Sequence, residues 1–141
     1  MPLAPIDGVV TAIDGDRKLA EFRVGSGTLR ISPRDLLSTG ASVGSTVRVQ
    51  LLARDIILAT ESPQGLSVRN SIAGVVEDIA QDDDDAVLVR VDIGGETVLS
   101  RITTAAAEAL QLQRGSRVWV LIKAVSMRGH AFTSRASSPA S

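Results

Sequence analysis

The chain has 141 residues, 44% of them hydrophobic, which is enough to build the core of one ordinary domain or of two very small ones. Its 15 basic and 16 acidic residues give a formal net charge of -1, and only 2% are aromatic, which argues against a protein that coats nucleic acid. Disulfides and thiolate metal sites are excluded because cysteine is absent, and no signal peptide or run of ~20 apolar residues is found, so a cytoplasmic location is expected.

The sequence contains an internal repeat of two copies. Gly8-Val9-Val10 recurs as Gly74-Val75-Val76, an offset of 66 residues. The offset grows to 69 between Ala20 and Val89, and to 71 between Val47 and Val118. We place the two increases at turns, the first across residues 81–85 and the second around the glycines of a later hairpin. Loops accept insertions and strands do not, so this pattern predicts two copies of one fold.

Each copy is predicted to consist of short strands and one short helix. In the first copy, residues 47–51 alternate apolar and polar, and Gly25 and Gly27 suit a hairpin turn. A short helix is then expected from the sequence Ser32-Pro33-Arg34-Asp35, which has the form of a capping box with proline at the first helical position.

The second copy repeats this order. Residues 87–93 place Val and Ile inward at every second position, and Gly94 and Gly95 mark the hairpin. Thr103 is expected to cap a helix over residues 105–110. The four aspartates within residues 81–85 are interpreted as a solvated loop, because a calcium loop would need spaced ligands and a glycine turn.

These elements predict an all-β protein with short helices, built as two tandem five-stranded barrels of the oligonucleotide/oligosaccharide-binding type. The expected domains are a first barrel over residues 1–62 and a second barrel over residues 66–128. The linker Ser62-Pro63-Gln64-Gly65 separates them, and residues 129–141 are expected to form a disordered tail.

Polar donors at the ends of two apolar segments form the candidate site. Segment 66–75 carries Ser67 and Arg69, segment 119–127 carries Lys123 and Ser126, and neither segment contains a carboxylate. Two cations and two hydroxyls suit a dianion that has no proton to donate. Thr103 is expected to act first as a helix cap and second as an oxyanion contact.

The second copy resembles the Mop/TOBE family of molybdate-binding barrels, on three segments that cover most of residues 66–127. These segments are Leu66-Ser67-Val68-Arg69-Asn70-Ser71-Ile72-Ala73-Gly74, Ser100-Arg101-Ile102-Thr103, and Val120-Leu121-Ile122-Lys123-Ala124-Val125-Ser126. With the first copy joined to it, the chain is similar to the C-terminal regulatory part of the ATP-binding subunit of a molybdate ABC importer. No Gly-x-x-x-x-Gly-Lys-Ser/Thr loop is present in the sequence, so we expect no catalysis by this chain.

The resemblance implies molybdate or tungstate as the ligand, with no cofactor and no metal bound other than as the oxyanion. It implies a homodimer whose sites take Ser67 and Arg69 from one chain and Lys123 and Ser126 from the other. An ATPase domain and membrane permease subunits are the implied partners, so the protein would be peripheral to the inner membrane. The first copy has Leu52 in place of Lys123, and Met1 and Leu3 in place of Ser67 and Arg69, so we expect it to be structural.

Each site residue also has a simpler interpretation. Lys123 could reach solvent, Arg69 could pair with Glu77 or Asp78, and Ser67 could be a turn residue. Asn70 is expected to fix backbone, and Trp119 to lie in the core or at a dimer interface, on the opposite face from its strand neighbours. The alternative function is therefore a structural and dimerisation module of a transporter ATPase with no specific ligand.

Overall fold

The computed structural model describes residues 3–14, 16, 19–33, 40–67, 70–123 and 132–134. The elements in the first half of the chain are β1 (Leu3–Asp14), β2 (Leu19–Val24), β3 (Gly27–Ile31), β4 (Thr46–Leu52), the 3-10 helix η1 (Ala53–Asp55) and β5 (Ile56–Ala59). Those in the second half are β6 (Asn70–Asp83), β7 (Ala86–Asp92), β8 (Thr97–Thr103), α2 (Thr104–Ala109), β9 (Arg117–Ile122) and β10 (Phe132–Ser134). The predicted all-β architecture is confirmed.

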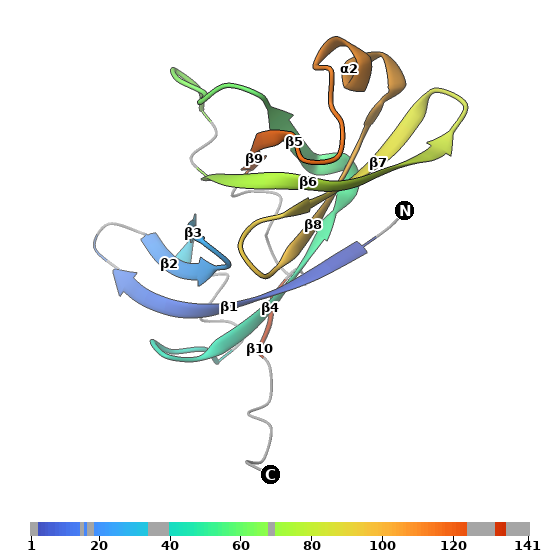
Figure 1. Ribbon diagram of the computed structural model, residues 1–141. Coiled ribbons are helices and arrows are strands. Elements are labelled where there is room, and N and C mark those ends of the chain that lie inside the picture. Colours follow the sequence, from blue (N-terminus) through green and yellow to red (C-terminus); the bar gives the residue numbers. More distant parts are fainter. Residues whose placement is uncertain are drawn as a thin grey trace.

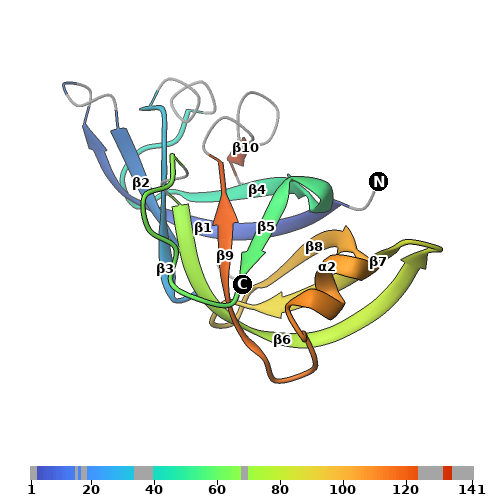
Figure 2. The same ribbon diagram turned by 90° about the horizontal axis from the view of Figure 1, so that it is seen from above.

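The strands form two five-stranded antiparallel sheets, which occupy the lower and upper halves of Figure 1. The first sheet has the order β10-β4-β1-β2-β3, and the second has the order β5-β9-β6-β7-β8. Strand β5 follows β4 in the chain but pairs with β9, and β10 follows β9 but pairs with β4 (Figure 2). Each copy therefore supplies the edge strand that completes the sheet of the other copy.

This exchange bears on the expected domains. Residues 56–59 fall within the range expected for the first barrel, yet they form the edge of the second sheet. Residues 132–134 fall within the expected disordered tail, yet they pair with residues 47–49 of β4. The edge of β4 offers unpaired backbone groups, and a three-residue strand can use them without any apolar period of its own. Residues 129–131 and 135–141 lie outside the described residues.

Backbone hydrogen bonds repeat between the copies. In the first copy, Val10 O accepts from Gly44 N at 2.8 Å, and Val10 N donates to Ser45 O at 2.9 Å. In the second copy, Val76 O accepts from Gly115 N at 2.8 Å, and Val76 N donates to Ser116 O at 2.9 Å. A register shift follows Val10 in β1 and Val76 in β6. Because the same irregularities recur at matching positions, the duplication predicted from the sequence is confirmed.

The position of the second insertion was predicted wrongly. Phe22 pairs with Leu29 in the first hairpin, and Val91 pairs with Val98 in the second. Val91 follows Phe22 by 69 residues, and Val98 follows Leu29 by the same number. The hairpins are therefore of equal length. The two extra residues of the second copy lie later, between Ser100 and Gly115, which correspond to Ile31 and Gly44. Glycine-rich turns tolerate many alignments, which is why sequence matching placed the insertion there.

The predicted alternation of the strands produces one core that spans both copies. Side chains Val87, Val89, Val91 and Ile93 are buried, as are Val47, Val49 and Leu51. Gly8 and Gly74 hold matching positions over this core. A Cβ on Gly8 would lie 2.5 Å from Phe22, and one on Gly74 would lie 2.6 Å from Val91, so the strands can cross this closely only without a side chain.

The second helix forms as expected. Thr103 precedes α2, and its Oγ1 accepts a hydrogen bond from Ala106 N at 3.0 Å. The helix expected after Ser32 falls largely on residues 34–39, which lie outside the described residues. No helix in the described part of the chain is long and apolar enough to cross a membrane.

The aspartates expected in a solvated loop are partly in a strand. Strand β6 continues to Asp83, and only the next two residues form the turn. Arg101 Nε lies 2.6 Å from Asp82 Oδ2, and Arg101 Nη2 lies 3.5 Å from Asp83 Oδ2. The hydrogen bond that Arg101 donates to Asp82 raises the pKa of Arg101, and the charges of the neighbouring aspartates act in the same direction. Asp82 and Asp83 at the end of β6 are thus paired with Arg101 of β8.

Hydrogen bonds link the two copies at the β2–β3 turn and at the start of β6. Ser26, in the β2–β3 turn, donates from its backbone N and its Oγ to Ile93 O, at 2.7 and 3.0 Å. Asn70, which is fully buried, accepts from Arg30 N at 2.7 Å and donates to Arg30 O at 3.0 Å. The amide of Asn70 therefore pairs with the edge of β3 as a neighbouring strand would. The expectation that Asn70 fixes backbone is confirmed.

Candidate functional site

The start of β6 and the end of β9 lie side by side. Asn70 and Ile122 are Cα partners in the antiparallel ladder between these strands. Lys123 directly follows Ile122 and is exposed, and Ser67 lies three residues before Asn70 and is also exposed. The ladder therefore brings the two segments that carry the expected donors to the same end of two neighbouring strands in the second sheet.

Lys123 forms no ion pair with any other described residue, and the Ser67 hydroxyl has no hydrogen-bond partner among them. Arg69 and Ser126 lie outside the described residues. An exposed ammonium without a carboxylate partner keeps its full attraction for an anionic ligand. Lys123 is therefore the part of the expected site that the structure describes most directly.

Thr103 lies at the end of β8, where it pairs with Ala86 of β7. Its hydroxyl oxygen is engaged as an acceptor in the helix cap, which leaves the hydroxyl proton free to be donated. No hydrogen bond joins Thr103 to Ser67 or Lys123 in the described part of the chain. The helix cap uses the hydroxyl oxygen, whereas a ligand would use the hydroxyl proton, so the two roles are compatible.

The second barrel closes next to Lys123. Ser100 of β8 is buried and donates from its Oγ to Ile56 O at 2.7 Å. Ile56 of β5 is in turn the Cα partner of Ile122. The strand that ends in Thr103 therefore approaches the end of β9 through β5, the strand that the first copy supplies.

The first copy lacks these donors at the corresponding place. Leu3 and Leu52, which correspond to Arg69 and Lys123 in the sequence repeat, are Cα partners in the ladder between β1 and β4. Neither leucine can donate a hydrogen bond from its side chain. This ladder of the first copy therefore lacks the side-chain donors that are expected at the matching ladder of the second copy.

The carboxylates proposed as simple partners for Arg69 have other partners. Glu77 lies 4.0 Å from Arg90, and Asp78 lies 3.6 Å from Arg114. Both pairs are exposed, and pairs of this kind contribute about 0–1 kcal/mol. Arg69 itself lies outside the described residues, so its interpretation as a surface ion-pair partner stays an alternative.

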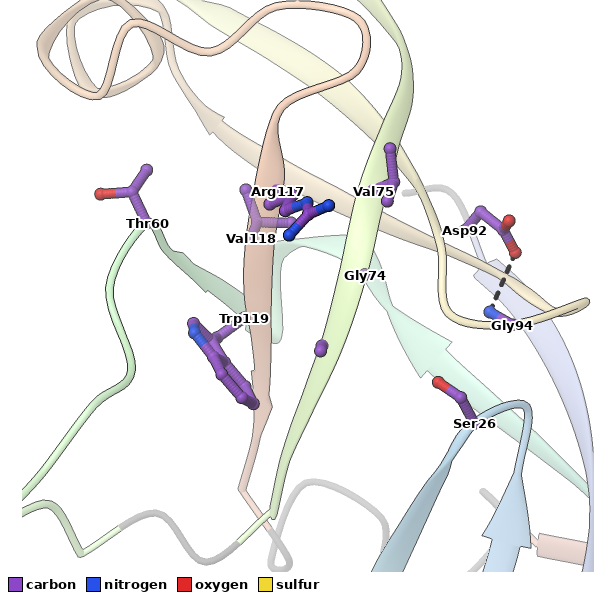
Figure 3. A pocket seen from close by; sticks show the side chains of 10 residues that line it. Ser26, Thr60, Gly74, Val75, Asp92, Gly94, Arg117, Val118 and Trp119 are labelled. Carbon is purple, nitrogen blue, oxygen red and sulfur yellow. Dashed lines mark hydrogen bonds between the residues drawn. The ribbon is translucent and has the colours of Figure 1, made fainter.

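A separate pocket lies on the outer face of the second sheet, with a volume of about 530 Å³. It is lined by Ser26, Thr60, Ala73, Gly74, Val75, Asp92, Gly94, Arg117, Val118 and Trp119. Trp119 and Thr60 lie to one side of β6, and Asp92, Gly94 and Ser26 lie to the other (Figure 3). As predicted, Trp119 faces away from its buried neighbours Val118 and Val120, but it is only partly buried and does not belong to the core.

Sequence reasoning did not select Arg117 as a functional residue. The signal was present in the repeat, since Arg117 corresponds to the neutral Thr46 at an outward position of the matching strand. The sequence shows that one copy has a cation at this position and the other does not. Only the pairing of the strands shows which residues surround that cation.

Residues 66–128 match the family model described as the TOBE domain. This part of the chain is therefore a TOBE domain. Over a longer range, it is similar to the molybdenum import ATP-binding protein ModC of Rhizobium etli, with 36% identity over 126 residues, which are 89% of this chain and 34% of that protein. ModC of Mesorhizobium japonicum is 42% identical over 101 residues, which are 72% of this chain and 26% of that protein.

The chain therefore spans about a third of the length of the curated relatives that it matches. Among solved structures, it is similar to the cytoplasmic molybdate-binding protein ModG with molybdate bound, with a TM-score of 0.66. The two share 23% sequence identity, and the match covers 85% of this chain and 89% of that one. At this identity the similarity shows the fold alone, and it confirms the expected TOBE-type barrel architecture.

Proposed function

We propose that the chain binds molybdate or tungstate and regulates a molybdate importer, as part of an ATP-binding subunit like the relatives named above. The observation that carries this proposal is Lys123, an exposed cation without a described ion-pair partner, at the ladder that joins β6 and β9. The names of the relatives and the fold of ModG support molybdate as the oxyanion.

The repeat supports placing Arg69 in the same site. The residues that correspond to Arg69 and Lys123 in the first copy, Leu3 and Leu52, stand opposite each other in their ladder. Side chains at directly opposed positions of an antiparallel pair lie about 4.5–5.5 Å apart at Cβ. We therefore propose that one oxyanion is held by both cations together with the hydroxyls of Ser67, Ser126 and Thr103.

A second copy of the chain is proposed to complete the site. Ser67 and Lys123 are both exposed, so in a single chain water would compete for each donor. Charge-assisted hydrogen bonds gain strength when water is excluded, which a covering protein surface would provide. We propose a homodimer in which Ser67 and Arg69 come from one chain and Lys123 and Ser126 from its partner.

A site made only of donors selects among tetrahedral anions. Molybdate carries no proton at neutral pH, whereas hydrogen phosphate carries one that would find no acceptor in such a site. Sulfate resembles molybdate in charge and differs mainly in size, so it must be rejected by fit. Tungstate is nearly the same as molybdate in shape and charge and is expected to bind with it.

Replacement of Lys123 by alanine is expected to weaken molybdate binding by about tenfold to a hundredfold, because it removes one charge-assisted hydrogen bond. Isothermal titration calorimetry of the full chain with molybdate, tungstate, sulfate and phosphate measures both the affinity and the selectivity. The unsubstituted chain should bind the first two and discriminate against the last two.

The matched control is Arg114→Ala, which removes an exposed cation that pairs with Asp78 in a different part of the second copy. Its affinity for molybdate should equal that of the unsubstituted chain. Equal weak heats for all four anions would instead favour a structural and dimerisation module without a specific ligand.

Regulation follows if the dimer arrangement and ligand occupancy are coupled. A ligand that bridges two chains binds one arrangement more tightly than others, and it shifts the population toward that arrangement. We propose that this arrangement is read by an attached ATPase domain and, through it, by the membrane permease subunits. By reciprocity, dimerisation of the chain should strengthen with molybdate, which sedimentation or light scattering can measure.

A further inference from the structure

The pocket beside Trp119 has a counterpart in the first copy, and the two differ in chemistry. The counterpart, of about 310 Å³, is lined by Asp7, Gly8, Val9, Arg23, Gly25, Thr46, Gly94, Gly95 and Glu96. Gly8 and Val9 correspond to Gly74 and Val75, and Thr46 corresponds to Arg117. The two pockets therefore lie at matching places on the backbone of the two copies and differ in their side chains.

In the first copy, an ion pair occupies the cross-strand position next to this counterpart pocket. Asp7 and Arg48 are Cα partners, and Arg48 Nε donates to Asp7 Oδ1 at 3.0 Å. The corresponding partners in the second copy are Ala73 and Trp119. The second copy has thus replaced a self-neutralising pair with a methyl group and an indole ring.

Small neighbours leave space around the indole. Trp119 of β9 is paired with Ala59 of β5 on one side and with Ala73 of β6 on the other. Directly opposed residues in a ladder share one face of the sheet, so a methyl group flanks the ring on each side. The exposed Val75 extends the apolar surface toward Arg117. A planar ligand body would find an aromatic and aliphatic wall here.

Arg117 supplies this wall with an uncompensated positive charge. It forms no ion pair with another described residue, whereas Arg30, Arg48, Arg54, Arg90, Arg101 and Arg114 each lie within 4.0 Å of a carboxylate. Arg117 and Asp92 flank Val75 in one row across three strands, which separates their Cα atoms by about 10 Å.

The carboxylate of Asp92 is engaged elsewhere. Its Oδ1 accepts hydrogen bonds from the backbone N of Gly94 and of Gly95, at 3.0 and 2.9 Å. These bonds stabilise the β7–β8 turn and offset part of the negative charge at that end of the pocket. The guanidinium of Arg117 is therefore the positive charge that the pocket offers to an anionic ligand.

We propose that this pocket binds a small organic anion with a planar apolar body, distinct from the oxyanion site. The anionic group would pair with Arg117, and the ring would pack against Trp119, Ala73 and Val75. Pockets of this volume with apolar walls and a few polar groups suit ligands of metabolite size. An inorganic dianion fits poorly, because Ala73 and Val75 offer it only apolar groups.

The probe is 2-naphthoate, with the neutral 2-naphthamide as its matched control. Isothermal titration calorimetry of the full chain with 2-naphthoate should show saturable binding, and 2-naphthamide should bind at least tenfold more weakly. Molybdate should not displace 2-naphthoate, so failure of the oxyanion proposal would leave this result unaffected.

Two variants locate the site. Arg117→Gln should remove the preference for 2-naphthoate over 2-naphthamide, and Ala73→Leu should weaken both probes by filling the space beside the ring. Arg114→Gln, which changes an exposed arginine outside the pocket, should bind as the unsubstituted chain does. Equal affinity for both probes, no saturable signal, or unchanged binding in Arg117→Gln would overturn the proposal.

Discussion

Replacement of Asn70 by alanine is expected to destabilise the chain by about 2–4 kcal/mol, because a buried backbone donor and acceptor both lose their partner. The partner groups are the N–H and C=O of Arg30, at 2.7 and 3.0 Å from the Asn70 amide. Strand β3 is the edge of the first sheet, so no further strand of that sheet can take over these bonds. Chemical denaturation of the full chain measures the loss.

An aspartate at the same position separates the two bonds. Asn70→Asp keeps an oxygen that can accept from Arg30 N but loses the N–H that donates to Arg30 O, so its ionised form should also destabilise the chain. Ser71→Ala is the matched control, since Ser71 is exposed and adjacent. If Asn70→Ala proved as stable as Ser71→Ala, the amide would not hold the two copies together as described.

The second copy by itself is expected not to fold. A fragment of residues 66–141 lacks β5, which is the ladder partner of β9 and contributes Ile56 and Leu58 to the core, at 2% and 8% exposure. Ser100 would also lose the acceptor of its buried hydrogen bond, the oxygen of Ile56. Loss of a core strand exposes apolar surface and leaves buried polar groups unpaired, and either effect can exceed the stability of a small domain.

The comparison is with a fragment of residues 53–141, which adds η1 and β5 to the same sequence. Thermal unfolding followed by circular dichroism should show that the longer fragment is the more stable of the two. A cooperative transition of similar midpoint in both fragments would mean that the second barrel does not depend on the exchanged strand.

The sequence was sufficient to predict features that depend on local periodicity. The inward positions of residues 87–93, the cap at Thr103 and the duplication itself each depend on residue types within one segment. Alternation fixes which face of a strand is buried, and a side-chain oxygen before a helix fixes its start. These features need no knowledge of which strands pair.

The exchange of β5 and β10 could not be predicted in this way. A strand that reads as apolar and alternating is compatible with either copy, because both sheets offer an edge of similar chemistry. The choice between them depends on the path of the chain after β4 and β9 and on contacts such as Ser100 with Ile56. Such long-range pairing leaves no periodic mark in the segment itself.

The candidate site was predicted in part. The sequence indicated the two segments that carry Ser67 and Lys123, and the structure places the strands of these segments side by side through Asn70 and Ile122. The pocket beside Trp119 was missed because its walls come from β6, β9 and two turns that are distant in the sequence. Arg69 and Ser126 lie outside the described residues, so their place in the site stays a prediction.

The most direct test of the proposed oxyanion site is anomalous diffraction from crystals of the full chain grown with molybdate. We predict a molybdenum peak within hydrogen-bonding distance of the Lys123 ammonium, at a contact between two copies, with Ser67 and Arg69 of the other copy as further donors. A peak remote from Lys123 in every copy, or none at saturating molybdate, would contradict the account.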